Sequence, residues 1–298
     1  MRSQRVQVLG LTRWSYPFGS KGFRRKGRSH QDQCARLYAP QRLDHRLFLL
    51  EHVLIPGLRA QKDKDFTHIF LLGEKLPEPW RSSVLALLAT VPQATAVFRP
   101  EGGNHRDVCR EVMLQHVDLT SDVTAQYRLD DDDGVAVDFV GKTREMFQEL
   151  SPFFEQCGRL ALDYSRGFIL RSTKDNISMQ PVSMRLWAPG MAIYQRAESL
   201  KSALDFHHLK VWHDMPTLTW QEQPMFIRGA HHDNDSDLAS FGRRTRGFEF
   251  NHRNPKRYFQ KRFGLHLDAI EQTWNQRKAH FLALEGDATS AKRVLRAA

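Results

Sequence analysis

The chain has 298 residues, which is enough for one large α/β domain or for one domain with an extension. Hydrophobic residues make up 41% and charged residues 26%, a balance typical of a globular protein with a buried core. No apolar stretch is long enough to cross a bilayer, and the N-terminus lacks the apolar core of a secretion signal. These features argue against a membrane-spanning or secreted protein and predict a cytoplasmic one.

The cysteines give the same indication. Cys34, Cys109 and Cys157 are widely spaced and form no C-x-x-C pair. This pattern fits a reducing compartment and argues against a disulfide framework or a zinc site.

The net charge is +10, and the basic excess is concentrated in Lys21–Arg28 and from Arg243 to the end. Such a balance fits a phosphate-rich ligand, an anionic membrane surface or nucleic acid. Charge alone does not choose among these partners.

Strands and helices are predicted to alternate along the first half of the chain. Apolar patterns and turn residues place strands at 5–11, 65–73, 95–98 and 124–129, and helices at 44–58, 79–90 and 104–116. The predicted helix at 44–58 is expected to end at Pro56-Gly57. This alternation predicts an α/β fold with a mostly parallel central sheet and helices on both faces.

The second half of the chain is less regular. A helix is expected at 139–147 and strands at 159–170, 184–194 and 225–228. The last segment is basic and has apolar residues at helical spacing, namely Phe263, Leu267, Ile270, Trp274 and Phe281. We therefore expect a main α/β domain at 1–240 and a basic helical C-terminal extension at 241–298.

An acidic run marks the end of the strand at 124–129. Asp130, Asp131, Asp132 and Asp133 follow it, and Gly134 allows a sharp turn. Four carboxylates at the end of a buried strand need a neutralising partner, and a hard divalent cation with oxygen ligands is the usual one. Strand alternation would place Asp130 and Asp132 on one face, as a D-x-D pair suited to Mg²⁺ or Mn²⁺ against a diphosphate. The alternative is a solvated acidic turn.

Three stretches carry a resemblance to a known family: GLTRWS (Gly10–Ser15), RLDDDD (Arg128–Asp133) and RGAHHDNDS (Arg228–Ser236). Together they resemble a bacterial rhamnosyltransferase family that looks like a branch of the GT-A glycosyltransferases. The resemblance extends from Arg5 to about Ser236 and leaves the C-terminal segment without a match.

The resemblance implies a metal-dependent transfer of a sugar, with rhamnose as one candidate, from a nucleotide-sugar donor to a glycan or lipid-linked saccharide. It places Asp130 near the donor ribose, Asp131 beside it on the donor, and Asp132 on Mn²⁺ or Mg²⁺. The four-carboxylate run leaves this assignment open by one position. His231 is the candidate for a further metal ligand, with its neighbour His232 as the alternative.

The resemblance also implies contacts with the donor. Thr12 and Arg13 follow the first strand, where GT-A enzymes contact the nucleotide, and Arg106 begins the helix before the acidic strand, where many of these enzymes have an arginine that faces the donor. Asp214 is the first candidate for the base that deprotonates the acceptor hydroxyl, and Asp163 and Glu198 are weaker ones.

Two other functions share some of these features. A metal-dependent phosphohydrolase or nuclease would also use clustered aspartates, and a nucleic-acid-binding protein would explain the basic ends. No P-loop, G-x-G-x-x-G or G-x-S-x-G motif occurs, and no nucleic-acid-binding motif is visible, so we expect no nucleic-acid partner. The basic C-terminal helix either packs on the catalytic domain or adds a peripheral attachment to the inner face of the membrane.

Overall fold

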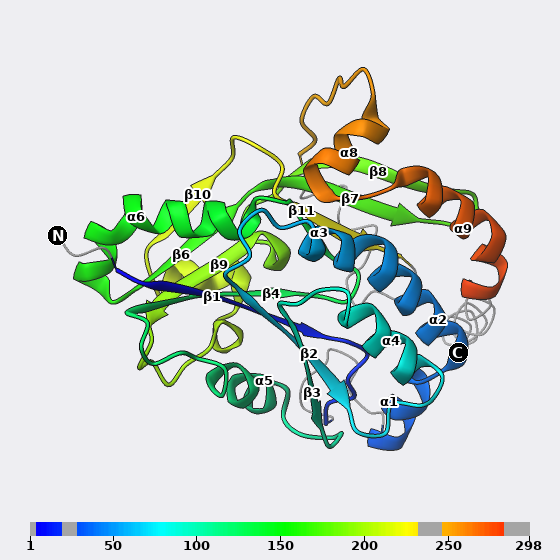
Figure 1. Cartoon of the computed structure of the whole chain (residues 1–298), viewed down its shortest axis with the longest axis horizontal. Helices are drawn as coiled ribbons and strands as arrows, with labels where there is room; N and C mark the ends of the chain where they lie inside the picture. Colours follow the sequence, from blue (N-terminus) through cyan, green and yellow to red (C-terminus); the bar gives the residue numbers. More distant parts are fainter. Residues whose placement is uncertain (1–3, 20–28, 232–245, 283–298) are drawn as a thin grey trace, which may run out of the picture.

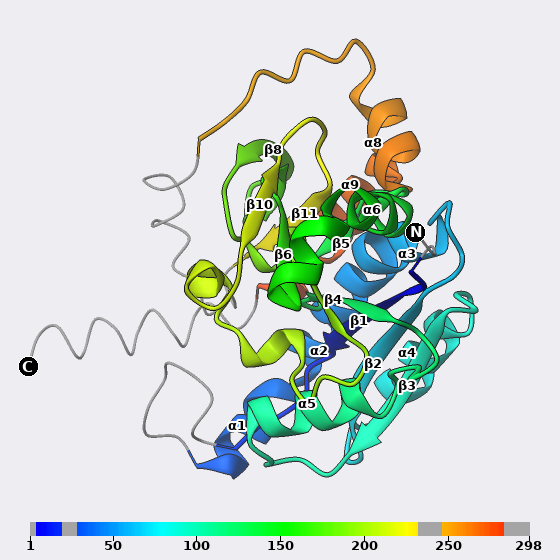
Figure 2. The same cartoon turned by 90° about the vertical axis from the view of Figure 1, so that its left-hand side faces the viewer.

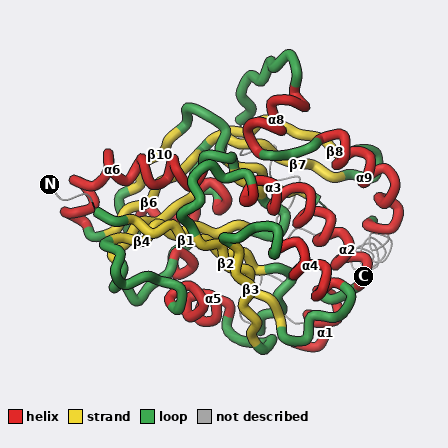
Figure 3. Tube along the Cα trace, viewed as in Figure 1, coloured by secondary structure: helices red, strands yellow, loops and turns green. Residues whose placement is uncertain are grey.

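The computed structural model describes residues 4–19, 29–231 and 246–282. The basic stretch at 21–28, His232 and the residues up to Ser236 lie outside these ranges. A central seven-stranded sheet runs through the molecule (Figures 1 and 3). Its strands in chain order are β1 (Val6–Arg13), β2 (Thr67–Gly73), β3 (Ala94–Arg99), β4 (Val123–Leu129), β6 (Arg159–Tyr164), β9 (Met191–Arg196) and β10 (Thr217–Trp220).

The spatial order is β10-β6-β9-β4-β1-β2-β3, and β9 alone runs against its neighbours. The sheet is therefore mostly parallel, as predicted. β1 and β4 lie side by side near its centre, with Thr12 opposite Leu129. Because parallel strands end at the same edge, the residues after Thr12 and Leu129 emerge together there.

Helices cover both faces of the sheet, which confirms that prediction. α4 (Trp80–Leu88) and α6 (Phe139–Cys157) pack against one face, and α5 (His105–Leu114) packs against the other (Figures 1 and 2). The alternation of side chains along β1 explains this arrangement, since Val8 packs in the first layer and Leu9 in the second.

A continuous helical stretch precedes β2, and it runs further than the sequence predicted. It consists of α2 (Pro40–Leu49), a π-helical turn η1 (Leu50–Leu54) and α3 (Ile55–Arg59). The expected end at Pro56-Gly57 was wrong because the π turn shifts the hydrogen bonds, so that the Ile55 N–H donates to the Leu50 carbonyl. Pro56 has no N–H to donate, but it lies in the first turn of α3, where this N–H is not needed. The helix therefore continues through it.

A second, four-stranded sheet was not predicted. It contains β5 (Gly134–Val135), β7 (Arg166–Ser172), β8 (Ile177–Ser183) and β11 (Phe226–Ala230), in the order β5-β11-β7-β8. The strand expected at 159–170 is in fact two strands, β6 and β7, which separate at Ser165 and enter different sheets. An apolar run has the same sequence pattern whether it stays in one sheet or passes into another. The pattern therefore could not predict that the chain changes sheets at Ser165.

The C-terminal segment forms α8 (Pro255–Phe263) and α9 (Leu267–Phe281), joined at Gly264 with φ of 72°. The helices lie beside the second sheet and α2 (Figure 1). Trp274 is fully buried, and its indole N–H donates to the Thr173 carbonyl over 3.2 Å. The apolar residues of both helices belong to the main core, so the boundary expected at 240 does not separate two cores.

Within the described residues, no helix combines the length and the apolar character that crossing a bilayer requires. The cytoplasmic location stays a prediction.

Candidate active site

The acidic run forms a tight turn at the carboxyl end of β4. The Asp133 N–H donates to the Asp130 carbonyl over 3.1 Å, and Asp133 Oδ2 accepts from the Asp130 N–H over 2.9 Å. Because β4 ends at Leu129, strand alternation does not extend into the run. The contacts of the run do not follow strand alternation: Asp131 and Asp132 share Arg46 as a partner, and Asp130 pairs with Arg13. A joint role of Asp130 and Asp132 at a diphosphate stays a prediction.

Asp130 faces the side of the sheet that α5 covers. Its carboxylate forms an ion pair with Arg13, whose guanidinium also contacts Nε2 of His105 at the start of α5. Burial, together with the nearby Arg13, lowers the pKa of His105 to about 3, so the ring is neutral and accepts from the guanidinium. Burial opposes the charge of Asp130, but Arg13 and Arg128 still hold the pKa of this carboxyl below its ordinary value.

Asp131 and Asp132 face α2 instead. Arg46 Nη1 lies 2.7 Å from Asp131 Oδ1 and 3.5 Å from Asp132 Oδ2, and only 5% of the Arg46 side chain is exposed. Arg42 Nη1 donates to Ser15 Oγ over 2.8 Å, and the Ser15 N–H donates to Asp131 Oδ2 over 3.2 Å. The turn is thus held by side chains and backbone that arrive from both β1 and α2.

The metal candidates Asp132 and His231 are brought together, with Asp132 Oδ2 2.9 Å from His231 Nε2. Both side chains are almost fully buried. The end of β11 approaches the turn at Gly229, where a Cβ atom would lie 2.5 Å from Asp132 Cβ. A glycine at this position therefore lets β11 carry His231 to Asp132.

Asp132 and His231 together would provide only a few ligand atoms for a metal ion. A carboxylate oxygen and an imidazole nitrogen suit Mn²⁺, and Mg²⁺ is often held by one or two carboxylates with phosphate and water completing its shell. Over the described ranges, no group of three or more His, Cys, Asp or Glu side chains is gathered around one point. The residues fit a cation that takes its remaining ligands from a bound diphosphate and water.

Five arginines act electrostatically on the acidic run, and sequence analysis assigned a role only to Arg13. They come from β1, α2, β4 and β11, and they are Arg13, Arg42, Arg46, Arg128 and Arg228. Burial raises the pKa of Asp131 although Arg46 and Arg42 act against it, and burial with the neighbouring carboxylates raises the pKa of Asp133 well above its ordinary value. With five guanidinium groups against four carboxyls, the turn does not repel an anion.

No sequence motif marked Arg42 and Arg46. Both are less than a tenth exposed, which is unusual for arginine and shows that they serve the turn. The helix that carries them is distant in sequence from the acidic run, so their role became visible only in the fold.

Thr12 lies in the interior and not at an open surface. Its Oγ1 is 2.9 Å from His68 Nε2, and His68 Nδ1 is 2.9 Å from the Tyr127 hydroxyl. Burial lowers the pKa of His68 to about 3, so the ring is neutral. Gly10 leaves room for this row of hydrogen-bonded side chains, because a Cβ atom on residue 10 would lie 2.3 Å from His68 Nδ1. The geometry makes Thr12 part of the support beneath the site.

Arg106 is exposed at the start of α5, and its backbone N–H donates to the cap Asn104 Oδ1 over 3.0 Å. Its neighbour His105, which sequence analysis passed over, is the residue of α5 that reaches Arg13. Helix position alone could not distinguish these two neighbours.

Of the candidate bases, Asp214 is exposed at the end of the turn η4 (His208–His213). Within the described part of the chain, its carboxylate has no hydrogen bond or ion pair. Asp163 is fully buried and accepts from the Leu186 N–H over 2.8 Å and from the Thr219 hydroxyl over 3.1 Å. Glu198 is exposed beyond the end of β9.

A mostly parallel sheet with helices on both faces, and an acidic turn at the carboxyl end of its central strand, define an α/β protein whose ligand site is expected at that edge of the sheet. A family model described as "Putative rhamnosyl transferase" matches residues 7–243. The chain belongs to this family, as the resemblance predicted. The match includes the turn and His231 and ends before α8.

Solved structures give more distant similarities. S. aureus TarS 1–349 in complex with UDP is 10% identical with a TM-score of 0.41, covering 75% of this chain and 60% of that one. The same protein with UDP-GlcNAc is 8% identical with a TM-score of 0.38, covering 86% and 64%. A protein from Bacillus anthracis described as a "Putative Glucose-1-Phosphate Thymidylyltransferase" is 13% identical with a TM-score of 0.34, covering 74% of this chain and 88% of that one. The chain spans less than two thirds of the TarS chains, and no curated protein matches it.

Proposed function

We propose that this protein is a glycosyltransferase that moves a sugar from a nucleotide-sugar donor to a glycan or lipid-linked saccharide. Rhamnose is one candidate sugar. The observation that carries the proposal is the acidic turn, where four carboxyls and five arginines meet at the edge of the sheet at which α/β folds bind ligands. The charge balance suits a diphosphate, and family membership supplies the reaction class.

In this proposal Asp132 and His231 hold Mn²⁺ or Mg²⁺ against the donor diphosphate. The bound cation supplies Lewis-acid neutralisation of the departing nucleoside diphosphate. Arg13, fixed between Asp130 and His105, presents its guanidinium to a phosphate or to the base, and Asp130 lies on the ribose side. Arg46 orients Asp131 and Asp132 before the donor arrives.

Asp214 remains our candidate for the general base. Its carboxylate is exposed and so can meet an acceptor hydroxyl. Both oxygens of Asp163 already accept hydrogen bonds, from Leu186 and Thr219, which makes Asp163 a structural carboxylate.

A thermal-shift series tests the donor site. UDP, GDP, dTDP and CDP are each added with and without Mn²⁺, because a ligand that binds only the folded state raises the melting temperature. We expect one nucleotide to stabilise the protein in the presence of Mn²⁺, and Asp132→Asn to remove that shift. Asp175→Asn, in the exposed turn between β7 and β8, is the control and should keep it.

The competing functions give different results in the same experiment. A phosphohydrolase would release phosphate from the nucleotide without any sugar acceptor, and a nucleic-acid-binding protein would be stabilised by an oligonucleotide without metal. If no nucleotide stabilises the protein with metal present, the proposal fails.

A further inference from the structure

The face of α8 turned to solvent is strongly basic. The stretch 253–262 contains five lysines and arginines and no acidic residue, namely Arg253, Lys256, Arg257, Lys261 and Arg262. The opposite face of the helix is apolar, with Phe259 and Phe263 buried in the main core. The family model matches residues 7–243, so this basic surface lies outside the matched region.

Two of these cations are engaged within the protein. Arg262 Nη1 lies 2.6 Å from Asp138 Oδ2, and Lys256 forms an ion pair with Asp268. Arg262 also donates from Nε to the Pro224 carbonyl over 2.9 Å. These contacts and the buried phenylalanines fix α8 on the body of the protein, so its exposed face is held in one orientation.

The other three cations are spaced four residues apart. Arg253, Arg257 and Lys261 are exposed, and among the residues that the structure describes their side chains have no hydrogen bond or ion pair. Arg257 and Lys261 lie one turn apart on the same side of α8, and Arg253 lies in the loop just before the N-cap Asn254. In the described part of the loop before α8, residues 246–254, the one acidic residue is Glu249, whose Oε1 accepts from Asn251 over 2.5 Å.

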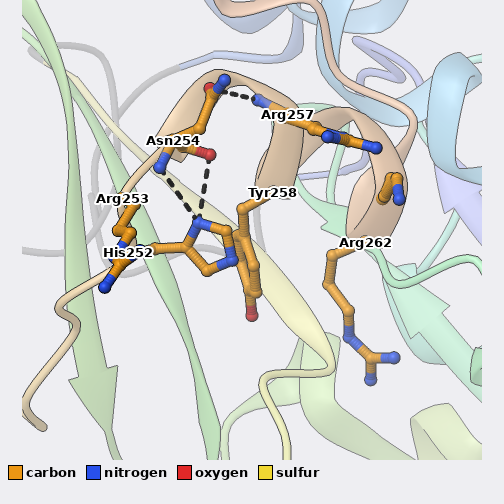
Figure 4. Close-up of a pocket in the computed structure, with 7 residues that line it drawn as sticks. His252, Arg253, Asn254, Arg257, Tyr258 and Arg262 are labelled. Atoms are coloured by element: carbon orange, nitrogen blue, oxygen red, sulfur yellow. Dashed lines mark hydrogen bonds between the residues drawn. The ribbon is translucent and has the colours of Figure 1, made fainter.

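The surface around these cations is open. A shallow hollow of about 600 Å³ is lined by His252, Arg253 and Tyr258 with their neighbours (Figure 4). A second hollow of about 730 Å³ shares Asn254 and Arg257 with it. In Figure 4 the side chains of Arg257 and Arg262 point in different directions and do not converge on one point. Separate cations along an open face suit a plane of many anions better than one small anion.

We propose that the exposed face of α8 docks the protein on an anionic membrane surface. A basic helix often inserts its apolar side into the lipid, but the apolar side of α8 is buried in the core. Docking is therefore electrostatic and without insertion, and it is reversed by salt. A nucleic acid is the less suitable partner because the rings of Phe259 and Phe263 are buried and Tyr258 is half-buried against Phe250 and His252, so no aromatic ring of α8 is left fully open to stack on a base.

The full-length protein is sedimented with vesicles of phosphatidylcholine, with and without phosphatidylglycerol. We expect binding only to the anionic vesicles and loss of binding at high salt. The variant Arg253→Gln/Arg257→Gln/Lys261→Gln should bind about a hundredfold more weakly, because each basic residue near the surface contributes about a fivefold factor. A control that removes the same charge elsewhere, Lys62→Gln/Lys75→Gln/Lys201→Gln, should keep most of the binding.

Three results would overturn the proposal: no binding of the parent protein, equal losses in the two triple variants, or tighter binding to duplex DNA than to vesicles with loss in the α8 variant. The melting temperature of the α8 variant without ligand should equal that of the parent protein, which shows that the variant is folded. This control needs no nucleotide, so docking is tested separately from sugar transfer and survives its failure.

Discussion

At the scale of single residues, the feature that organises the site is a buried arginine. Arg46 lies on α2 and contacts Asp131 and Asp132. The side chains of these two aspartates are less than a tenth exposed, so water does little to neutralise them. A buried ion pair of this kind contributes little net stability as a pair, but removing one partner leaves the other charge uncompensated. A substitution that removes only the guanidinium is therefore expected to lower the stability of the folded protein.

We expect Arg46→Met to lower the free energy of unfolding by about 3–5 kcal/mol, because Asp131 would remain buried without its cation. Urea unfolding of the parent and the variant measures the difference. Arg106→Met is the control, since Arg106 is exposed and surface changes usually stay within about 0.5 kcal/mol. Equal stability of the two variants would show that Arg46 does not neutralise the turn.

Asp163 provides a test by pH. Burial raises the pKa of Asp163 to about 6, whereas an aspartate in an unfolded chain has a pKa of about 4. Between these values the folded protein keeps a proton that the unfolded chain has lost, so this group makes stability fall as pH rises. Asp163→Asn should gain about 3 kcal/mol relative to the parent between about pH 4 and pH 7. Chemical unfolding across this range measures the gain, and a constant difference would contradict it.

At the scale of elements, the site depends on how closely β11 approaches the turn after β4. Gly229 belongs to β11 of the second sheet, and it lies against Asp132 in the turn that follows β4 of the first sheet. The second sheet therefore has a direct role in the site, because it carries His231 to the edge of the first sheet.

Gly229→Ala tests this approach. A Cβ at 2.5 Å from Asp132 Cβ cannot be accommodated without moving β11 or the turn, and overpacking of this kind costs about 1–3 kcal/mol. We expect the variant to stay folded but to lose the Mn²⁺-dependent thermal shift with nucleotide. Gly141→Ala in α6, where the nearest atom would be at an ordinary 3.5 Å, is the control and should keep the shift. An unchanged shift in Gly229→Ala would show that the approach is not needed.

At the scale of the whole molecule, the C-terminal helices complete the main core. Phe259, Phe263, Ile270, Trp274 and Phe281 are all buried in it. Removing a buried Phe or Trp side chain usually costs about 3–5 kcal/mol, and a domain has about 5–15 kcal/mol in total.

A chain cut after residue 240 should therefore lose cooperative thermal unfolding, which near-UV circular dichroism measures. A chain cut after residue 282 keeps α8 and α9 and is the control. If the shorter chain melts like the longer one, residues 1–240 are an independent domain, as the sequence suggested.

Much of this architecture could be predicted because it depends on local patterns. The run Val6–Arg13 has the apolar character of a buried strand, and the helices at 79–90 and 104–116 were expected close to α4 and α5. The second sheet could not be predicted, since β8 alternates poorly and β5 has two residues. The pairing of a poorly alternating strand or a two-residue strand is decided by distant neighbours and not by its own sequence.

The sequence by itself determined the alternating strands and helices, the position of the acidic run after β4, and the residues Asp132 and His231 as a candidate pair. Side-chain periodicity is a local property that sets where a strand ends, and it therefore determined the elements and the place of the run. The pair of Asp132 and His231 was implied by the resemblance to the family. The tertiary structure alone decided that Arg46 neutralises Asp131 and Asp132, that His105 and not Arg106 reaches Arg13, and that Thr12 faces the interior. These contacts join residues far apart in the chain, and only the packing of α2, α5 and β11 around the end of β4 sets their distances.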